Sequence, residues 1–104
     1  MTKYSAVCTN GYASKKEATR AAELRLLERA GVIGPVTEQL VFELLPADPK
    51  LGYKRPLRYV ADFRYLDLAN KREIVEDVKG FRTPVYKLKK RLMAQLLGIT
   101  ITEV

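Results

Sequence analysis

The sequence predicts an α/β domain in which a helix, three strands, a second helix and a short final strand follow one another. Two observations carry this prediction. Helix-capping residues precede two segments with helical spacing of apolar residues, and the chain between them alternates apolar with polar residues. With 104 residues, the chain has the size of one domain and no room for a second.

The first helix is expected to begin with a capping box, which Ser14 forms with Glu17 three residues later. Three apolar residues make its main stripe: Ala21, Leu24 and Leu27. Gly31 is suited to end the helix. Residues 1–12 show neither helical nor strand periodicity, so we expect an irregular N-terminal arm there.

Three strands are expected next, at residues 37–45, 58–66 and 73–79. The first two strands show clear alternation. The apolar face of the first consists of Leu40, Phe42 and Leu44, and the apolar face of the second consists of Tyr59, Ala61, Phe63 and Tyr65. Residues 46–56 hold three prolines and a glycine, which predicts a connecting loop. A polar turn around Asn70 leads into the third strand, and Gly80 ends it.

The second helix is expected to begin at Thr83, as N-cap, with Pro84 at the first helical position. Four residues form the predicted apolar stripe: Val85, Leu88, Leu92 and Leu96. Gly98 closes this helix, and residues 99–102 alternate as a short final strand.

The composition excludes several kinds of chemistry. The chain has no histidine, which removes Ser-His and Cys-His catalysis, histidine general bases and Cys/His zinc sites. Its one cysteine, Cys8, forms no internal disulfide, and no signal peptide or membrane span is visible, so we expect a cytoplasmic protein. The net charge of +7 fits a polyanionic partner and equally fits ordinary solubility charge.

Asp62, Asp77 and Lys79 form the most informative constellation. Residues two apart in a strand share a face, so Asp77 and Lys79 project together. If the second and third strands pair symmetrically about the Ala69–Asn70 bond, Asp62 lies opposite Asp77; a bulge would shift this register. Two adjacent carboxylates repel one another unless a cation such as Mg²⁺ lies between them, and the lysine can orient water or stabilise phosphate charge. The bare pattern also occurs on ordinary solvated strand faces.

Three motifs in order resemble the PD-(D/E)XK nuclease superfamily: residues 12–18, Ala61-Asp62-Phe63, and residues 75–80. More narrowly, they are similar to a small, mostly phage-encoded family of uncharacterised endonuclease-like proteins. The likeness runs from about Gly11 to the end of the second helix. It implies a restriction-endonuclease-like αβββαβ core, a mixed sheet flanked by two helices. The chain departs from the commonest pattern in having Ala61 instead of proline and Asp77 instead of glutamate, with Glu76 as an extra carboxylate.

The resemblance also implies the site. Mg²⁺ or Mn²⁺ would be held by Glu17, Asp62, Asp77 and the backbone carbonyl of Val78, with Lys79 as the catalytic lysine. Gln39 is similar to an accessory polar residue in related transposon-end nucleases. Glu17 is also the capping-box glutamate, and a side chain folded back onto its cap cannot reach a metal at the same instant.

Six basic residues are candidates for gripping DNA phosphates: Lys15, Lys16, Arg82, Lys87, Lys90 and Arg91. A solvated helix face explains those of the second helix equally well. The leading hypothesis is a metal-dependent DNA endonuclease, with structure-selective cleavage as one option. It would serve phage replication, recombination or packaging in a bacterial cytoplasm, as a homodimer or within a larger nucleoprotein assembly. The alternatives are a non-catalytic nucleic-acid-binding or adaptor domain and a structural assembly protein.

Overall fold

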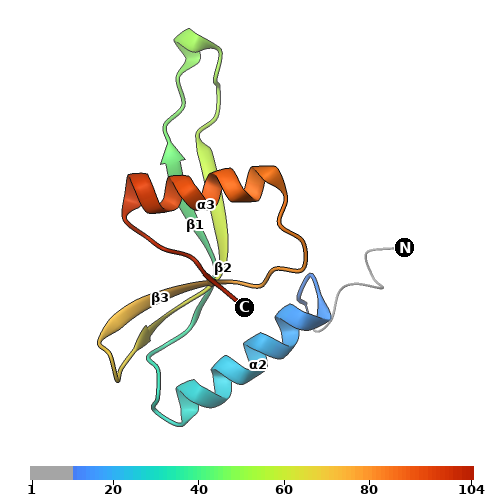
Figure 1. Ribbon diagram of the computed structural model, residues 1–104, viewed down its shortest axis with the longest axis vertical. Coiled ribbons are helices and arrows are strands. Elements are labelled where there is room, and N and C mark those ends of the chain that lie inside the picture. The colour runs from blue at the N-terminus through green and yellow to red at the C-terminus, as the bar shows by residue number, and fades with distance from the viewer. Residues whose placement is uncertain (1–10) are drawn as a thin grey trace. The chain divides into compact units, whose positions relative to one another are not determined.

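The computed structural model describes residues 11–104, and the chain divides into two compact units. The elements follow in the order α2 (Lys15–Arg29), β1 (Thr37–Leu45), the 3-10 turn η1 (Pro49–Leu51), β2 (Leu57–Asp67), β3 (Arg72–Asp77), α3 (Pro84–Leu97) and β4 (Thr102–Glu103) (Figure 1). Among residues 11–104, two helices and a four-stranded mixed sheet confirm the predicted α/β class and element order. Within the described residues, neither helix has the length and apolarity needed to cross a bilayer.

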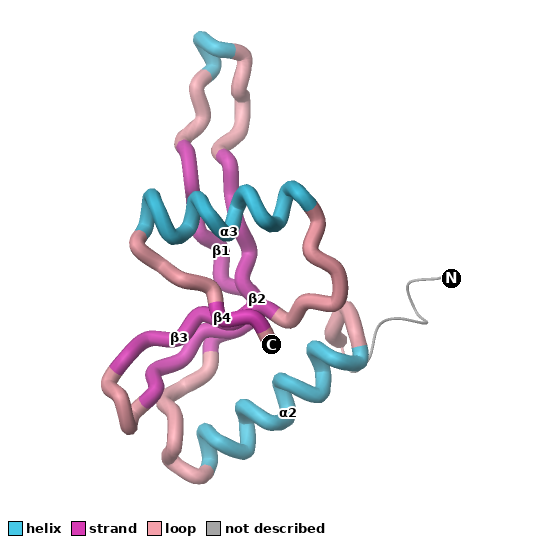
Figure 2. The backbone as a smooth tube through the Cα atoms, in the orientation of Figure 1, coloured by secondary structure: helices cyan, strands magenta, loops and turns pink. Residues whose placement is uncertain are grey.

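The sheet has the strand order β1-β2-β3-β4. Strand β1 runs antiparallel to β2, and β3 runs parallel to β4 (Figure 2). The parallel pair is joined through helix α3, as parallel strands require a crossover connection. In its register, Asp77 is the partner of Glu103. These two carboxylates therefore stand on neighbouring strands at the same level of the sheet.

The second unit, Thr37–Arg64 with Ile74–Val104, contains the larger core. Its buried cluster consists of Leu44, Tyr59, Ala61, Val75, Tyr86, Met93 and Ile101. The alternation predicted for the second strand is confirmed here, because Tyr59, Ala61 and Phe63 are all buried. One face of β2 thus contributes to the core while Asp62, between them, points to the other face.

The first unit contains α2 and the segment Tyr65–Glu73, which comprises the end of β2, the β2–β3 turn at residues 68–71 and the start of β3. Ser14 caps α2 as predicted, because its Oγ accepts the backbone N–H of Glu17 at 3.1 Å. Ala21 and Leu24 are buried, which confirms the stripe, and Gly31 follows the helix with a φ of +78°. The N–H of Gly34 donates to the carbonyl of Leu66 at 2.9 Å, which joins the chain after α2 to the turn.

The apolar stripe predicted for the second helix is only partly right, because Leu92 is half-buried against the core whereas the other three members are exposed. Val85 and Leu88 are 61% and 56% exposed, whereas Tyr86 and Met93 are buried. The helical spacing of apolar residues is compatible with burial of either of these two faces. The aromatic ring of Tyr86 is buried because its hydroxyl donates to Glu103 at 2.7 Å, a long-range partner that helical periodicity does not reveal.

Three predicted boundaries also differ. Strand β3 ends at Asp77 instead of Lys79, and β4 occupies Thr102–Glu103 instead of residues 99–102. Beyond Asp77, single backbone hydrogen bonds to the terminal Val104 replace the regular ladder. Residues 46–56 form an ordered hairpin end that contains η1, not a simple loop. Of the predicted N-terminal arm, residues 1–10, with Cys8, lie outside the described residues.

Candidate active site

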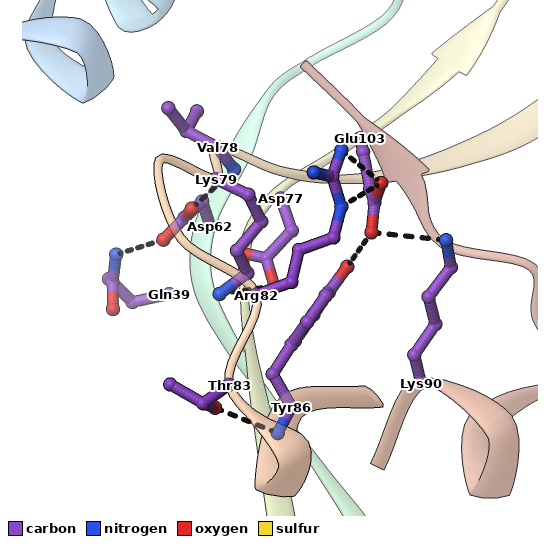
Figure 3. Close-up of polar contacts among 10 residues, drawn as sticks. All are labelled: Gln39, Asp62, Asp77, Val78, Lys79, Arg82, Thr83, Tyr86, Lys90 and Glu103. Atoms are coloured by element: carbon purple, nitrogen blue, oxygen red, sulfur yellow. Dashed lines mark hydrogen bonds and ion pairs between the residues drawn. The ribbon is translucent and has the colours of Figure 1, made fainter. Parts of the chain in front are cut away.

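Asp62 and the end of β3 are brought together by a direct hydrogen bond. The Asp62 side chain is half-buried on β2, and its Oδ2 accepts the backbone N–H of Val78 at 2.8 Å (Figure 3). Val78 immediately follows Asp77, so the carboxylate of Asp62 lies beside the segment that carries the third predicted motif. The exact pairing of Asp62 with Asp77 stays a prediction. The motif of Asp62 and the motif that contains Val78 nevertheless lie in contact within the second unit.

Gln39 completes this corner from β1. Its neighbours pair as Glu38 with Phe63 and Leu40 with Ala61, which places Gln39 opposite Asp62, and its Nε2 lies 3.5 Å from Asp62 Oδ1. Gln39 has a φ of 52°, in the left-handed region that non-glycine residues rarely adopt. Such strain costs on the order of 1–3 kcal/mol and clusters at functional sites. The predicted accessory residue therefore does contact the predicted carboxylate.

Asp77 is a buried carboxylate whose negative charge is only partly balanced by its neighbours. Its side chain is 2% exposed, and the Lys79 ammonium lies 3.2 Å from Oδ2 as an ion pair. Apart from Lys79, no donor within residues 11–104 reaches that oxygen. Burial raises the pKa of Asp77, the charge and hydrogen bonding of Lys79 lower it, and the charge of Glu103 raises it again. Asp77 therefore has unused capacity to bind a cation.

Lys79 is held between two partners. Its Nζ forms the ion pair with Asp77 and lies 4.2 Å from the centre of the Tyr86 ring, in a cation–π contact. The prediction that Asp77 and Lys79 project together is confirmed by the ion pair, although β3 ends before Lys79. With 24% of its side chain exposed, Lys79 remains accessible to a substrate.

Glu103 is the residue that the sequence reasoning missed. It accepts hydrogen bonds from Arg82 Nε at 2.8 Å and from the Tyr86 hydroxyl at 2.7 Å, and forms an ion pair with Lys90 at 3.1 Å. These donors, Arg82 first, lower the pKa of Glu103 to about 2. Burial and the same Glu103 contact raise the pKa of the Tyr86 hydroxyl. One signal was available, because Glu103 is the sole acidic side chain after Asp77.

Basic side chains surround a cavity of about 320 Å³ beside this network. Four of its lining residues are predicted nucleic-acid contacts: Arg82, Lys87, Lys90 and Arg91. Tyr86 and Glu103 line it as well, which links the cavity to the partners of Lys79. The structure therefore brings four of the six predicted basic residues to one concave surface.

The other predicted residues belong to the first unit. Lys15 and Lys16 are exposed in the first turn of α2, and Glu17 beside them is 8% exposed. The backbone of Glu17 takes part in the predicted cap through Ser14. A role for the Glu17 carboxylate as a metal ligand stays a prediction.

The donor set suits a hard divalent cation. No group of three or more His, Cys, Asp or Glu side chains able to hold a metal occurs within residues 11–104. Mg²⁺, however, is commonly bound through one or two carboxylates and keeps several waters. Asp62, Asp77 with its poorly compensated Oδ2, and the main-chain carbonyl of Val78 offer oxygens of the required kind.

These features define an α/β protein in which two adjacent strands each carry an aspartate, a lysine follows the second strand, and a basic cavity shares residues with this network. The chain belongs to the family described as "Protein of unknown function (DUF1064)", whose model matches residues 1–100. No curated protein and no solved structure matches it. The family match agrees with the expected family of unknown function, and membership of the wider nuclease superfamily stays a prediction.

Proposed function

We propose that this protein is a Mg²⁺- or Mn²⁺-dependent DNA endonuclease of the PD-(D/E)XK type. The observation that carries the proposal is the contact of the Asp62 carboxylate with Val78, one residue after a buried Asp77 that pairs with Lys79. This contact joins two of the motifs on which the resemblance rests. The underneutralised Asp77 gives a reason for a cation to bind there.

Each side chain has a role in phosphodiester hydrolysis. A bound divalent metal would supply an activated water and positive charge at the scissile phosphate. The Val78 N–H fixes the orientation of the Asp62 carboxylate, so little ordering is needed when a ligand arrives. The Lys79 ammonium stabilises negative charge that develops on the phosphate, and the Tyr86 ring holds it in place. Cations lining the basic cavity bind neighbouring phosphates.

The test is incubation of the purified protein with supercoiled plasmid and with branched DNA, in Mg²⁺, in Mn²⁺ or in EDTA. We expect metal-dependent cleavage that Asp77→Asn and Lys79→Ala abolish. Glu43→Gln, an exposed acid on β1, and Lys71→Ala, an exposed lysine in the β2–β3 turn, are matched controls that retain activity. Cleavage that survives both Asp77→Asn and Lys79→Ala excludes this site as its source.

Cleavage products also report the assembly. Concerted cutting of both strands needs two active sites, and one chain offers one, so linear plasmid formed without a nicked intermediate would support a homodimer. Accumulation of nicked circles would support a protomer that acts alone. Sedimentation of the protein with and without DNA distinguishes both from a larger nucleoprotein assembly.

A second candidate, a non-catalytic DNA-binding or adaptor protein, is favoured by the basic cavity alone. It predicts salt-sensitive DNA binding, no cleavage with any metal, and little effect of Lys79→Ala on affinity. The plasmid assay separates the two, since only the nuclease requires both Asp77 and Lys79.

A further inference from the structure

The β1–β2 hairpin extends well past helix α3 (Figures 1 and 2). The end of this hairpin carries exposed apolar side chains. Leu51 in η1 is 71% exposed and Tyr53 is 65% exposed. Large side chains at such exposure, gathered at the end of a projecting hairpin, are typical of binding surfaces. Neither residue takes part in the candidate active site.

The hairpin end is internally fixed by its own backbone. The N–H of Asp48 donates to the carbonyl of Tyr53 at 2.8 Å, and the N–H of Tyr53 donates back to Asp48 at 2.9 Å. Between them, Leu51 donates to Asp48, and Gly52 turns the chain with a φ of +92°. The Tyr53 ring therefore projects from an ordered turn, and a ligand that contacts it has little backbone to order.

A cavity of about 280 Å³ lies at the base of this turn. It is lined by Leu45, Pro46, Tyr53, Arg55, Pro56 and Leu57. This volume is slightly below the range of about 300–1,000 Å³ that is usual for small-molecule sites, and suits a ligand group no larger than a single ring system. Its walls are two leucine and two proline side chains, the Tyr53 ring and one guanidinium, and the aromatic ring and the guanidinium can stack on a planar ligand.

Positive charge surrounds the same surface. Lys50, Lys54, Arg55 and Arg58 all lie within residues 46–58 and are exposed, and Asp48 is the one acidic residue of that segment. Cations around an aromatic platform complement a ligand that has planar rings on a polyanionic backbone. That combination describes a nucleic-acid strand with unpaired bases.

We propose that the hairpin end binds one unpaired nucleobase, stacked on Tyr53, while the surrounding cations bind the flanking phosphates. The basis is the exposed Tyr53 ring, the cavity beside it and the local excess of Lys and Arg. This inference goes beyond the proposed cleavage reaction, because it concerns binding and holds equally for a protein that does not cut. It assigns a preference for DNA that carries a single-stranded region.

The test is fluorescence anisotropy in EDTA, which prevents metal-dependent cleavage. Three labelled probes of one sequence are compared: a single strand, a blunt duplex and a duplex with a central gap. Stacking on one aromatic side chain is worth about 1–3 kcal/mol, so we expect Tyr53→Ala to weaken binding to the single-stranded and gapped probes by about 5- to 150-fold. Affinity for the blunt duplex changes by less than about twofold, because its bases are not free to stack.

Two further variants separate stacking from general damage. Tyr53→Phe retains the ring and keeps the affinity for single strands, and Leu68→Ala, at an exposed apolar residue of the β2–β3 turn, leaves all three affinities unchanged. The proposal is overturned if Tyr53→Ala leaves single-strand affinity intact, if it weakens all three probes equally, or if Tyr53→Phe is as damaging as Tyr53→Ala. Intact affinity would indicate a protein partner for this surface.

A measurement on the unchanged protein covers the case in which Tyr53→Ala fails to fold. A single strand that contains 2-aminopurine loses fluorescence when that base stacks on an aromatic ring. We expect the protein to quench this signal in EDTA, with or without any nuclease activity in the plasmid assay. Binding without quenching would overturn the stacking proposal and leave the proposed cleavage unaffected.

Discussion

Replacing Asp77 by asparagine is expected to stabilise the metal-free protein while abolishing its activity. The Lys79 ammonium lies 3.2 Å from Asp77 Oδ2. At an effective dielectric constant of about 20, this pair contributes about 5 kcal/mol. Burying one ion costs several kcal/mol, so the two quantities nearly cancel. The raised pKa of Asp77 shows that burial and the charge of Glu103 outweigh the lysine.

The size of the gain follows from what the substitution leaves behind. Losing one partner of a fully buried pair usually costs several kcal/mol, because the other charge stays buried and uncompensated. Lys79 is 24% exposed and keeps its contact with the Tyr86 ring, so most of that cost does not arise. We expect Asp77→Asn to gain about 1 kcal/mol, which for a domain of this size raises the melting temperature by about 4–8 °C.

The gain depends on pH and metal in a defined direction. A carboxyl whose pKa is raised on folding does not destabilise the protein below its ordinary pKa of 3.8, and destabilises it increasingly as pH rises through the raised value. The advantage of Asp77→Asn is therefore largest near neutral pH and shrinks on acidification. If the proposed metal site is correct, we expect saturating Mg²⁺ to reverse the order, because at about 100 times its Kd it would stabilise the unchanged site by about 2.7 kcal/mol.

The assay is thermal unfolding at pH 4.5 and 7.5, in EDTA and in Mg²⁺, with Glu43→Gln as the control for removal of an exposed charge. A natively folded Asp77→Asn protein that melts below the parent in EDTA at pH 7.5 would refute the reasoning, since the ion pair would then outweigh burial. Equal Mg²⁺ shifts in the parent and Asp77→Asn would refute metal binding at this carboxylate.

Two further predictions test the surroundings of the site, and a third tests the β2–β3 turn. Tyr86→Leu removes the ring under Lys79 and is expected to lower the single-turnover cleavage rate at least tenfold, whereas Tyr86→Phe, which keeps the ring, lowers it only a few-fold. Glu103→Gln removes a charge that raises the pKa of Asp77, so the acid limb of the cleavage rate should move to lower pH, and an unchanged limb contradicts this coupling. Lys71 has a φ of 54°, so Lys71→Gly should raise the free energy of unfolding in urea by about 1 kcal/mol, and a lower value argues against strain there.

The features that were predictable from sequence are those encoded within a few residues. Ser14 and Thr83 cap their helices as expected, because each cap involves a backbone N–H only three residues away. The β2 face of Tyr59, Ala61 and Phe63 was predictable because alternation in a strand is also local. Asp77 and Lys79 are two residues apart, so their ion pair is also a short-range contact, although β3 ends at Asp77 and the Tyr86 ring of α3 helps to position Lys79.

The features that were missed depend on contacts between distant parts of the chain. Glu103 has its role because the parallel register of β3 with β4 sets it beside Asp77, and helix α3 supplies its donors. No spacing rule predicts a register across a crossover connection. The burial of Tyr86 follows from the same contact, so the partly wrong helix face and the missed carboxylate have one cause. Residue propensities likewise do not predict the left-handed conformation of Gln39, because they favour an ordinary strand at this position.

The register of Asp77 with Glu103 allows a comparison of the two carboxylates, and their surroundings explain why a cation would bind Asp77 in preference to Glu103. Both side chains occupy equivalent positions on neighbouring strands, but Glu103 is neutralised by Arg82 and Lys90 and has a pKa lowered to about 2. Asp77 has Lys79 alone, and its pKa is raised. A divalent ion arriving at this edge of the sheet gains more from Asp77, since it relieves a charge that the protein leaves uncompensated. Glu103, already saturated with donors, fixes the cations and the Tyr86 ring around that site.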